Sequence, residues 1–266
     1  MPPDTPTSQR AHADPPPRPA PDGIAALPDG PDRDDALAAL YRWPAPTAGA
    51  SAVVRANMIS SLDGGSTVDG RSAGLGNAAD EHLFTLLRDL AEVILVGAGT
   101  VRAERYGGIR LDPTRSARRR RWGLPADPPP IAVVTGRGLD TRSPLFTDTA
   151  VPPIVITTEA VADLVPKGVP VIIAGHDRVN LSDAIGSLAA TGYGRIHCEG
   201  GPALLAALAA AGLLDECCLT ISPLMLGSTA TALLPVALDN PLGWHLLTAR
   251  VGGDHLFTRY QRAVGR

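Results

Sequence analysis

The sequence has little of several things that would point to a class of protein. Aromatic residues make up 4% of its 266 residues, so the core has to be built from aliphatic side chains. Three cysteines, of which Cys217 and Cys218 are neighbours, make no disulfide framework and indicate a reducing compartment. The formal net charge of −3 gives no reason to expect a nucleic-acid or membrane partner. No apolar run approaches the roughly 18 residues of a membrane span, and the first residues lack a secretion signal. We therefore expect a cytoplasmic protein.

Proline is abundant, but much of it is at one end. Ten of the 26 prolines fall within the first 31 residues, and proline disfavours both helix and sheet. We expect residues 1–33 to form a flexible tail and residues 34–51 a linker with a short helix over 34–41. Residues 52–266 are then the folded domain. Deletion of residues 1–31 is expected to leave the melting temperature unchanged.

Apolar runs alternate with helical patterns along the rest of the chain. This alternation is typical of an α/β domain with a mostly parallel central sheet flanked by helices. The turn residues 252–254 precede a run that we expect to form an antiparallel C-terminal edge. The expected strands are 53–59, 93–97, 131–135, 154–158, 169–174, 195–198, 217–223 and 256–260, and the expected helices are 78–90, 181–192 and 202–212.

The stretch ILVGAGTV, residues 94–101, is a buried-strand pattern that ends in a glycine turn. A dinucleotide-binding fingerprint needs a third glycine, but Arg102 stands at that position. A second glycine turn, Gly200 and Gly201, follows the strand at 195–198 and precedes Pro202, which suits the first turn of a helix. Because ligands bind at the carboxyl ends of parallel strands, the two turns together predict a cleft that holds phosphate.

Two further patterns resemble functional motifs, but we expect neither to form a binding site. The arginine-rich segment 114–122 lacks interleaved aromatics, and we expect it to be a solvated loop. His197-Cys198-Glu199 imitates half of a zinc-deaminase motif, but the partner motif P-C-x-x-C is absent, so we expect no metal site.

A third polar cluster follows the first strand. Asn57, Asp63 and Ser72 can offer several polar contacts to a ligand at the same edge of the sheet. Asp63-Gly64 is also a strong turn signal by itself, so a purely structural role for Asp63 is an equal alternative.

Taken in order, these motifs resemble the reductases of riboflavin biosynthesis, the RibD C-terminal family, over roughly residues 52–262. The matching motifs are S-L-D-G (61–64), L-L-R (86–88), V-G-x-G-T-V (96–101), E-G-G-P (199–202), L-D-E (214–216) and P-x-x-x-G (223–227). The resemblance implies a dihydrofolate-reductase-like fold. It also implies an NADPH-dependent oxidoreductase that reduces the ribosyl group of 5-amino-6-(5-phosphoribosylamino)uracil to ribityl.

The resemblance also implies roles for individual residues. Those expected to bind the cofactor are Ser60, Gly74, Thr100 and Glu104, with the stretch Gly200, Gly201, Pro202, Ala203, Leu204 and Leu205 holding the pyrophosphate. Those expected to bind substrate are Ser72, Arg88 and Glu199, and we add Asn57 from its place in the strand. We expect the backbone of Gly97, Gly99 and Gly200 to lie against the cofactor. Asp63 or Glu199 is expected to orient the proton donor.

The sequence departs from the family at several places. A proline-rich segment stands where many bacterial members carry a deaminase domain, so we expect the reductase alone. Glu104 replaces the usual aspartate, and Arg105-Tyr106 replaces the usual Asp-Pro. Two other readings stay open: a reductase of this fold acting on a pterin or dihydrofolate, and a non-catalytic nucleotide-binding regulator.

Two expectations concern selectivity and assembly. Arg137, just after the strand at 131–135, is a candidate for the 2′-phosphate of NADPH, although an exposed arginine in a turn is an equal alternative. An unpaired sheet edge near the C-terminus is a liability that a second copy can cover, so we expect a homodimer.

Overall fold

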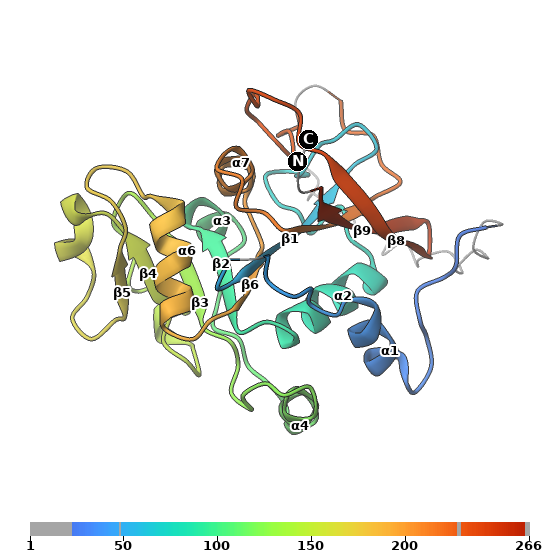
Figure 1. The fold of residues 1–266 in the computed structure, drawn as a ribbon, viewed down its shortest axis with the longest axis horizontal. Helices are drawn as coiled ribbons and strands as arrows, with labels where there is room; N and C mark the ends of the chain where they lie inside the picture. Colours follow the sequence, from blue (N-terminus) through green and yellow to red (C-terminus); the bar gives the residue numbers. More distant parts are fainter. Residues whose placement is uncertain (1–22, 48, 228–229, 264–266) are drawn as a thin grey trace, which may run out of the picture.

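The computed structural model describes residues 23–47, 49–227 and 230–263. Nine strands form one sheet in the order β5-β4-β3-β2-β6-β1-β7-β9-β8 (Figure 1). All neighbouring strands are parallel except at one edge, where β9 is antiparallel to both β7 and β8. The strands are β1 (Val53–Ser60), β2 (Val93–Gly97), β3 (Ile131–Val134), β4 (Ile154–Thr157), β5 (Val171–Ile173), β6 (Arg195–Cys198), β7 (Glu216–Ile221), β8 (Trp244–Gly252) and β9 (His255–Arg262).

Helices cover both faces of this sheet. One face packs against α6 (Leu181–Ala190) and α7 (Pro202–Ala210), which contribute Leu188 and Leu208 to a core with β1, β2 and β6. The other face packs against α1 (Arg33–Leu40), α2 (Ala78–Asp89) and α3 (Ala98–Ala103). The remaining helical segments are α4 (Pro113–Arg121), α5 (Pro144–Thr147) and a 3-10 turn (Glu159–Leu164). The expected α/β architecture with a parallel sheet and an antiparallel C-terminal edge is confirmed.

Helix α2 shows how the sequence places a functional side chain. Asn77 caps its start by accepting a hydrogen bond from the Asp80 amide. Leu83, Leu86 and Leu87 are buried, which is the spacing of one helix face. Arg88 follows directly in the last turn of α2. Burial of the leucine face therefore fixes the backbone position from which the Arg88 side chain extends.

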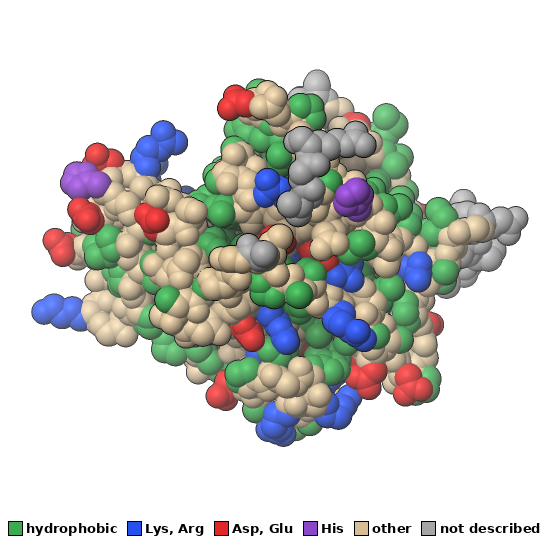
Figure 2. All heavy atoms as spheres, viewed as in Figure 1, with side chains coloured by type: hydrophobic (Ala, Val, Ile, Leu, Met, Phe, Trp, Pro, Cys, Tyr) green, Lys and Arg blue, Asp and Glu red, His purple; other side chains and the backbone are tan. Residues whose placement is uncertain are grey.

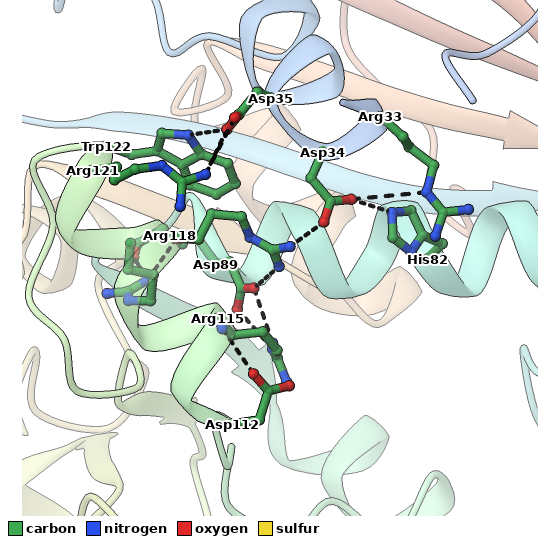
Figure 3. A network of polar contacts seen from close by, with 12 residues as sticks. Arg33, Asp34, Asp35, His82, Asp89, Asp112, Arg115, Arg118, Arg121 and Trp122 are labelled. Atoms are coloured by element: carbon green, nitrogen blue, oxygen red, sulfur yellow. Dashed lines mark hydrogen bonds and ion pairs between the residues drawn. The ribbon is translucent and has the colours of Figure 1, made fainter. Parts of the chain in front are cut away.

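The arginine-rich segment is not the solvated loop that we expected. It forms α4, which is capped at its start by Asp112. Figure 3 shows Arg115 and Arg118 converging on the carboxylate of Asp89, at nitrogen–oxygen distances of 2.7 and 2.6 Å. Arg118 also contacts Asp34 of α1. The arginines therefore join α4 to α1 and α2. The polar pattern suggested an exposed loop because the sequence does not show these acidic partners.

A second buried charge cluster lies between β1, β7 and β9. Glu216 accepts hydrogen bonds from Arg55 Nε at 2.7 Å and from Arg259 Nε at 2.9 Å. The side chains of Arg55 and Glu216 are completely buried. Both arginines also donate to the carbonyl of Arg42, and Arg55 stacks 4.0 Å from the ring centroid of Trp43. The cluster therefore fastens the segment after α1 to the sheet.

The C-terminal edge is larger than expected. We predicted one edge strand from the run 256–260, but β8 pairs with β9 as a hairpin and forms the outermost strand. Most of the first half of β8 is exposed, including Leu246 and Leu247. Its apolar residues are scattered, so the sequence shows no clear alternation.

The end of the expected tail is bound to the domain. Residues 1–22 lie outside the described part of the chain, so that part of the expectation is not addressed. Leu27 donates from its amide to the carbonyl of Val251 at 2.8 Å, and Val251 donates to Ala25 at 3.1 Å. Leu27 also packs against the core between α1 and α2. Residues 25–27 therefore act as part of the fold, and α1 is a packed element rather than a linker.

These contacts reverse our expectation about truncation. Deletion of residues 1–31 is now expected to lower the free energy of unfolding by about 1–2 kcal/mol, because a partly buried leucine and two backbone hydrogen bonds are lost. Thermal unfolding of the truncated protein and of Leu27→Ala in the full chain measures this. An unchanged melting temperature in both would show that the contacts contribute nothing.

Charged side chains of both signs are mixed on the visible face of the molecule. Acidic and basic side chains are interspersed over the face seen in Figure 2. Among the described residues, every helix is too short or too polar to cross a bilayer.

Candidate active site

A large cleft lies at the carboxyl ends of the central strands. Its volume is about 1040 Å³, at the upper end of the roughly 300–1,000 Å³ common for ligand pockets. It is lined by residues from β1, from the ends of β2 and β6, and from α2, α3 and α7. This is the edge of a parallel sheet at which ligands bind.

The two glycine turns predicted from the sequence meet in this cleft. The Gly97 amide donates to the Gly200 carbonyl at 2.8 Å, so the turns after β2 and β6 are in direct contact. Helix α7 begins at Pro202, next to Gly201 as its N-cap. The first amides of α7 have no partner within the helix and can bind an anion. The Gly97–Thr100 turn forms the neighbouring wall.

The glycines of these turns serve different purposes. A β-carbon at Gly201 would collide with the hydroxyl of Thr100, and one at Gly200 would lie 3.0 Å from the Met58 methyl. Gly200 also has a φ of +79°, which side chains rarely adopt. Gly200 is not among the residues that line the cleft, so its contact with a cofactor stays a prediction. Gly99 does line it, and a β-carbon there would meet no atom within 4 Å.

The polar centre of the cleft is an ion pair between Arg88 and Glu199. Arg88 Nε and Nη2 donate to the two carboxylate oxygens of Glu199 at 2.6 and 2.7 Å. Tyr106 donates its hydroxyl to the same carboxylate at 2.6 Å. The Arg88 guanidinium stacks on Phe84, 4.3 Å from the ring centroid. The side chain of Glu199 is 1% exposed and that of Arg88 is 20% exposed, so the pair is fixed while one side of the guanidinium remains accessible.

The protonation states of this centre follow from its geometry. Burial alone raises the pKa of Glu199, but the charge and hydrogen bonds of Arg88 outweigh it, so the pKa lies below its usual value. Burial, followed by the charge of Glu199, raises the pKa of Tyr106 well above its usual value. Near neutral pH, Glu199 is a carboxylate and Tyr106 is a phenol. Glu199 therefore holds Arg88 in place and has no proton to donate.

Two further predicted residues are linked across the cleft. Ser72 donates from its amide to Glu104 Oε1 at 2.7 Å and from its hydroxyl at 3.0 Å. Glu104 is the C-cap of α3, so it holds the loop that carries Ser72 against that helix. Glu104 thus faces a protein loop as well as the cleft.

The structure brings together most of the predicted site residues. Those that line the cleft are Asn57, Ser72, Arg88, Gly97, Gly99, Thr100, Glu104, Glu199, Gly201, Pro202, Ala203 and Leu204. The remaining predicted residues, Ser60, Asp63, Gly74, Arg137, Gly200 and Leu205, are not among its lining residues.

Asp63 lies in a turn and outside the lining of the cleft. Its carboxylate accepts hydrogen bonds from the Ser61 hydroxyl and from the amides of Leu226 and Gly227. The Ser61 hydrogen bond, followed by those from Gly227 and Leu226, lowers the pKa of Asp63 to about 2. Asp63 is therefore an acceptor that joins two loops, which is the contact expected of a turn residue, and its catalytic role stays a prediction.

The other outlying residues have structural explanations. Ser60 is buried, and its carbonyl accepts from the Ser222 amide. Leu205 points into the core below α7, and a β-carbon at Gly74 would meet Val68. Arg137 lies after the carboxyl end of β3, next to β2 in the sheet, but outside the cleft lining.

Among the cleft residues that sequence reasoning missed are Asp80, Arg105 and Tyr106. Burial raises the pKa of Asp80, whereas the pKa of Glu199 is lowered. Asp80 is therefore better suited than Glu199 to hold a proton. Asp80 lies in the first turn of α2, where an acidic residue is expected for helix stability alone. Tyr106 and Arg105 lie beyond the glycine motif, where the family pattern gave no guide.

His197 and Cys198, the first two residues of the zinc-deaminase-like motif, are part of the core at the end of β6. His197 is fully buried, and burial lowers the pKa of its imidazole to about 4. Burial also raises the pKa of the Cys198 thiol to about 12, so the thiol stays protonated and unreactive. Within the described ranges, no group of three or more His, Cys, Asp or Glu side chains is placed to hold a metal ion.

Comparison with solved structures places this architecture among known reductases. A pyrimidine reductase-like protein from Corynebacterium diphtheriae shares 26% identity, with 86% of this chain and 99% of that chain covered and a TM-score of 0.73. The riboflavin biosynthesis reductase Rib7 of Saccharomyces cerevisiae shares 18% identity, with 88% and 100% covered and a TM-score of 0.65. RibD of Acinetobacter baumannii shares 20% identity over 80% of this chain and 58% of its own, with a TM-score of 0.62. The expected dihydrofolate-reductase-like fold is thereby confirmed.

Two sequence comparisons give different results. A comparison with curated protein sequences gives no significant match. The model of the RibD C-terminal domain, however, matches residues 52–256. Since that match runs from the start of β1 into β9 and includes every wall of the cleft, the chain belongs to the RibD C-terminal domain family.

Proposed function

We propose that this protein is an NADPH-dependent reductase that converts the ribosyl group of 5-amino-6-(5-phosphoribosylamino)uracil to ribityl. The observation that carries the proposal is one cleft with a helix start for an anion on one side and a fixed Arg88–Glu199 pair on the other. A reductase that brings a nicotinamide cofactor to a phosphorylated substrate has to hold both ligands side by side in one cleft. The family membership supports the same reaction class.

The residues present fit such a cofactor. Open space at Gly99 leaves room for a ligand against the backbone, and the first amides of α7 are free to bind a pyrophosphate. Thr100, Gly201, Ala203 and Leu204 would form the rest of that wall. Bound there, NADPH would supply the hydride. Arg137, at the end of β3, is proposed to contact its 2′-phosphate.

The substrate side would be formed by Asn57, Ser72 and Arg88. Because Glu199 binds Arg88 through Nε and Nη2, Nη1 is proposed to hold an anionic or hydroxyl group of the sugar. Ionised Glu199 fixes this orientation. Asp80, whose pKa burial raises, is proposed as the source of the proton that the opened sugar requires.

Turnover with purified protein tests this function. With NADPH and the pyrimidine substrate, we expect loss of the absorbance of the reduced cofactor, and formation of the ribityl product by mass spectrometry. Arg88→Met is the inactive control, since it retains the length of the side chain without its charge. Oxidation of NADPH with dihydrofolate but not with the pyrimidine would favour the pterin reading. Absence of turnover with either would favour a nucleotide-binding regulator.

Gly99 provides a test of the cofactor wall that does not depend on turnover. Gly99→Val is expected to weaken NADPH binding by at least about tenfold, or roughly 1.4 kcal/mol, because the added methyl groups fill space that the ligand needs. Gly186→Val in α6 is the matched control, since a β-carbon there also meets no atom within 4 Å. Calorimetry measures affinity, and circular dichroism checks the fold. Equal affinities in both variants would remove Gly99 from the site.

We also propose that the protein is a homodimer. Edge strand β8 exposes Leu246 and Leu247, with 55% and 41% of their surfaces accessible, and long apolar edges tend to be covered. Sedimentation is expected to give a dimer at micromolar concentration, and Leu246→Glu with Leu247→Glu should give a monomer. A monomeric wild-type protein would contradict the proposal.

A further inference from the structure

Arg105 occupies a backbone position that suits glycine. It follows α3 directly and has a φ of +53°. The Tyr106 amide donates to the Val101 carbonyl at 3.0 Å, which closes the last turn of α3 around Arg105. Helices that end in this way favour glycine at the left-handed residue, since a β-carbon there is strained. Among the described residues, Asp69 is the other non-glycine residue with positive φ, and short polar side chains tolerate this conformation better. An arginine here lowers the stability of the fold.

The guanidinium of Arg105 is available to a ligand. Of the described residues that line the cleft, Arg88 and Arg105 are the only arginines or lysines. Arg88 is already paired with Glu199. Arg105 is exposed and makes no ion pair or hydrogen bond with any residue in the described ranges. It is therefore the unpaired cation at the mouth of a cleft that has Asp80, Glu81, Glu104 and Glu199 among its lining residues.

The neighbours of Arg105 place it on the substrate side. Glu104, which we expected to contact the cofactor, instead accepts from Ser72 on the substrate side, and Tyr106 binds Glu199 beside Arg88. The glycine turn proposed for the cofactor lies at the other end of α3, a helix of six residues that spans about 9 Å. Arg137, the candidate for the 2′-phosphate, follows β3 and is outside the cleft lining.

We propose that Arg105 is a specificity-determining residue that binds the phosphate monoester of the substrate. This inference rests on the proposed function and extends it by naming the group that the phosphate contacts. A charge-assisted contact between Arg105 and a dianion would offset the strain of an arginine at this backbone position. The 2′-phosphate of NADPH has the same chemistry, so the experiment has to separate the two sources.

The test uses Arg105→Gly, which removes the cation and relieves the strain. The melting temperature is expected to stay the same or rise. Calorimetry with ribose 5-phosphate as the probe is expected to show at least about tenfold weaker binding than in the wild type, as for loss of one charge-assisted hydrogen bond. Arg105→Lys should recover part of the affinity. Ribose, which lacks the phosphate, should bind both proteins equally.

Three outcomes would overturn the proposal. Unchanged ribose 5-phosphate binding would show that Arg105 is idle. Weaker NADPH binding with unchanged ribose 5-phosphate binding would assign it to the cofactor. A lower melting temperature would show that it stabilises the fold. Because these measurements need no turnover, they distinguish failure of this proposal from failure of the proposed reaction.

Discussion

Replacement of Glu216 by alanine is expected to destabilise the protein by about 3–5 kcal/mol, the cost of removing one partner from a buried ion pair. Arg55 would lose its carboxylate while fully buried, and Arg259 would lose its partner with 10% of its side chain exposed. Domains of this kind are stable by roughly 5–15 kcal/mol, so the variant should be close to unfolding. Urea denaturation followed by circular dichroism measures the change.

A matched control comes from an exposed pair. Asp140 contacts Arg142 at 3.1 Å, but their side chains are 57% and 90% exposed. Asp140→Ala is expected to leave the urea midpoint unchanged, because exposed pairs add little to stability. If Glu216→Ala were as stable as this control, water would have to reach Arg55 and Arg259, and the cluster would not fasten the segment after α1.

Substitution of Glu199 by glutamine is expected to lower kcat/KM by about 100-fold or more, which is roughly 2.7 kcal/mol of transition-state stabilisation. The amide would face the donors of Arg88 and Tyr106 and could not accept from all of them. Loss of one partner from a buried charge pair typically costs about 2–5 kcal/mol. NADPH affinity should be nearly unchanged, because the proposed cofactor wall is formed by other residues.

Tyr106→Phe is the graded control for that substitution. It removes one hydrogen bond to Glu199 and leaves the Arg88 pair intact, so the expected loss is about tenfold or less. Steady-state kinetics over a range of pH gives a second check. The pKa of Glu199 is lowered in the folded protein. Its contribution to kcat/KM should therefore be fully present above the usual carboxyl pKa, and it should be lost only as the pH falls through the lowered pKa. A Glu199-dependent limb near neutral pH would contradict the assignment.

The strands of the parallel sheet could be predicted from the sequence because most of them are short, largely apolar runs bounded by turn residues. The first of them, expected at 53–59, is β1 (Val53–Ser60), and the helix expected at 202–212 is α7 (Pro202–Ala210). Helix α4 could not be predicted in this way, since its arginines read as solvated until Asp89 and Asp34 are known to lie beside them. The same holds for Leu27, whose partner Val251 is far along the chain.

The site was predictable where it depends on backbone and less so where it depends on side-chain contacts. The glycine turns at 97–99 and 200–201 predicted the edge of the sheet at which the cleft lies. The sequence could not decide the role of Asp63, because an Asp-Gly turn and a catalytic aspartate look alike and its amide donors at 226–227 lie in a distant loop. Tyr106 was missed because its partner Glu199 is 93 residues away.

The order of strands in the sheet has a consequence for synthesis on the ribosome. β1 lies between β6 and β7, and Arg55 meets Glu216, 161 residues later in the chain. At about 5–20 residues per second, the nascent β1 remains without both neighbours for roughly 8–32 s. An apolar strand left unpaired for that time is a target for chaperones and a route to aggregation, so the yield of soluble protein should depend on translation speed and chaperone supply.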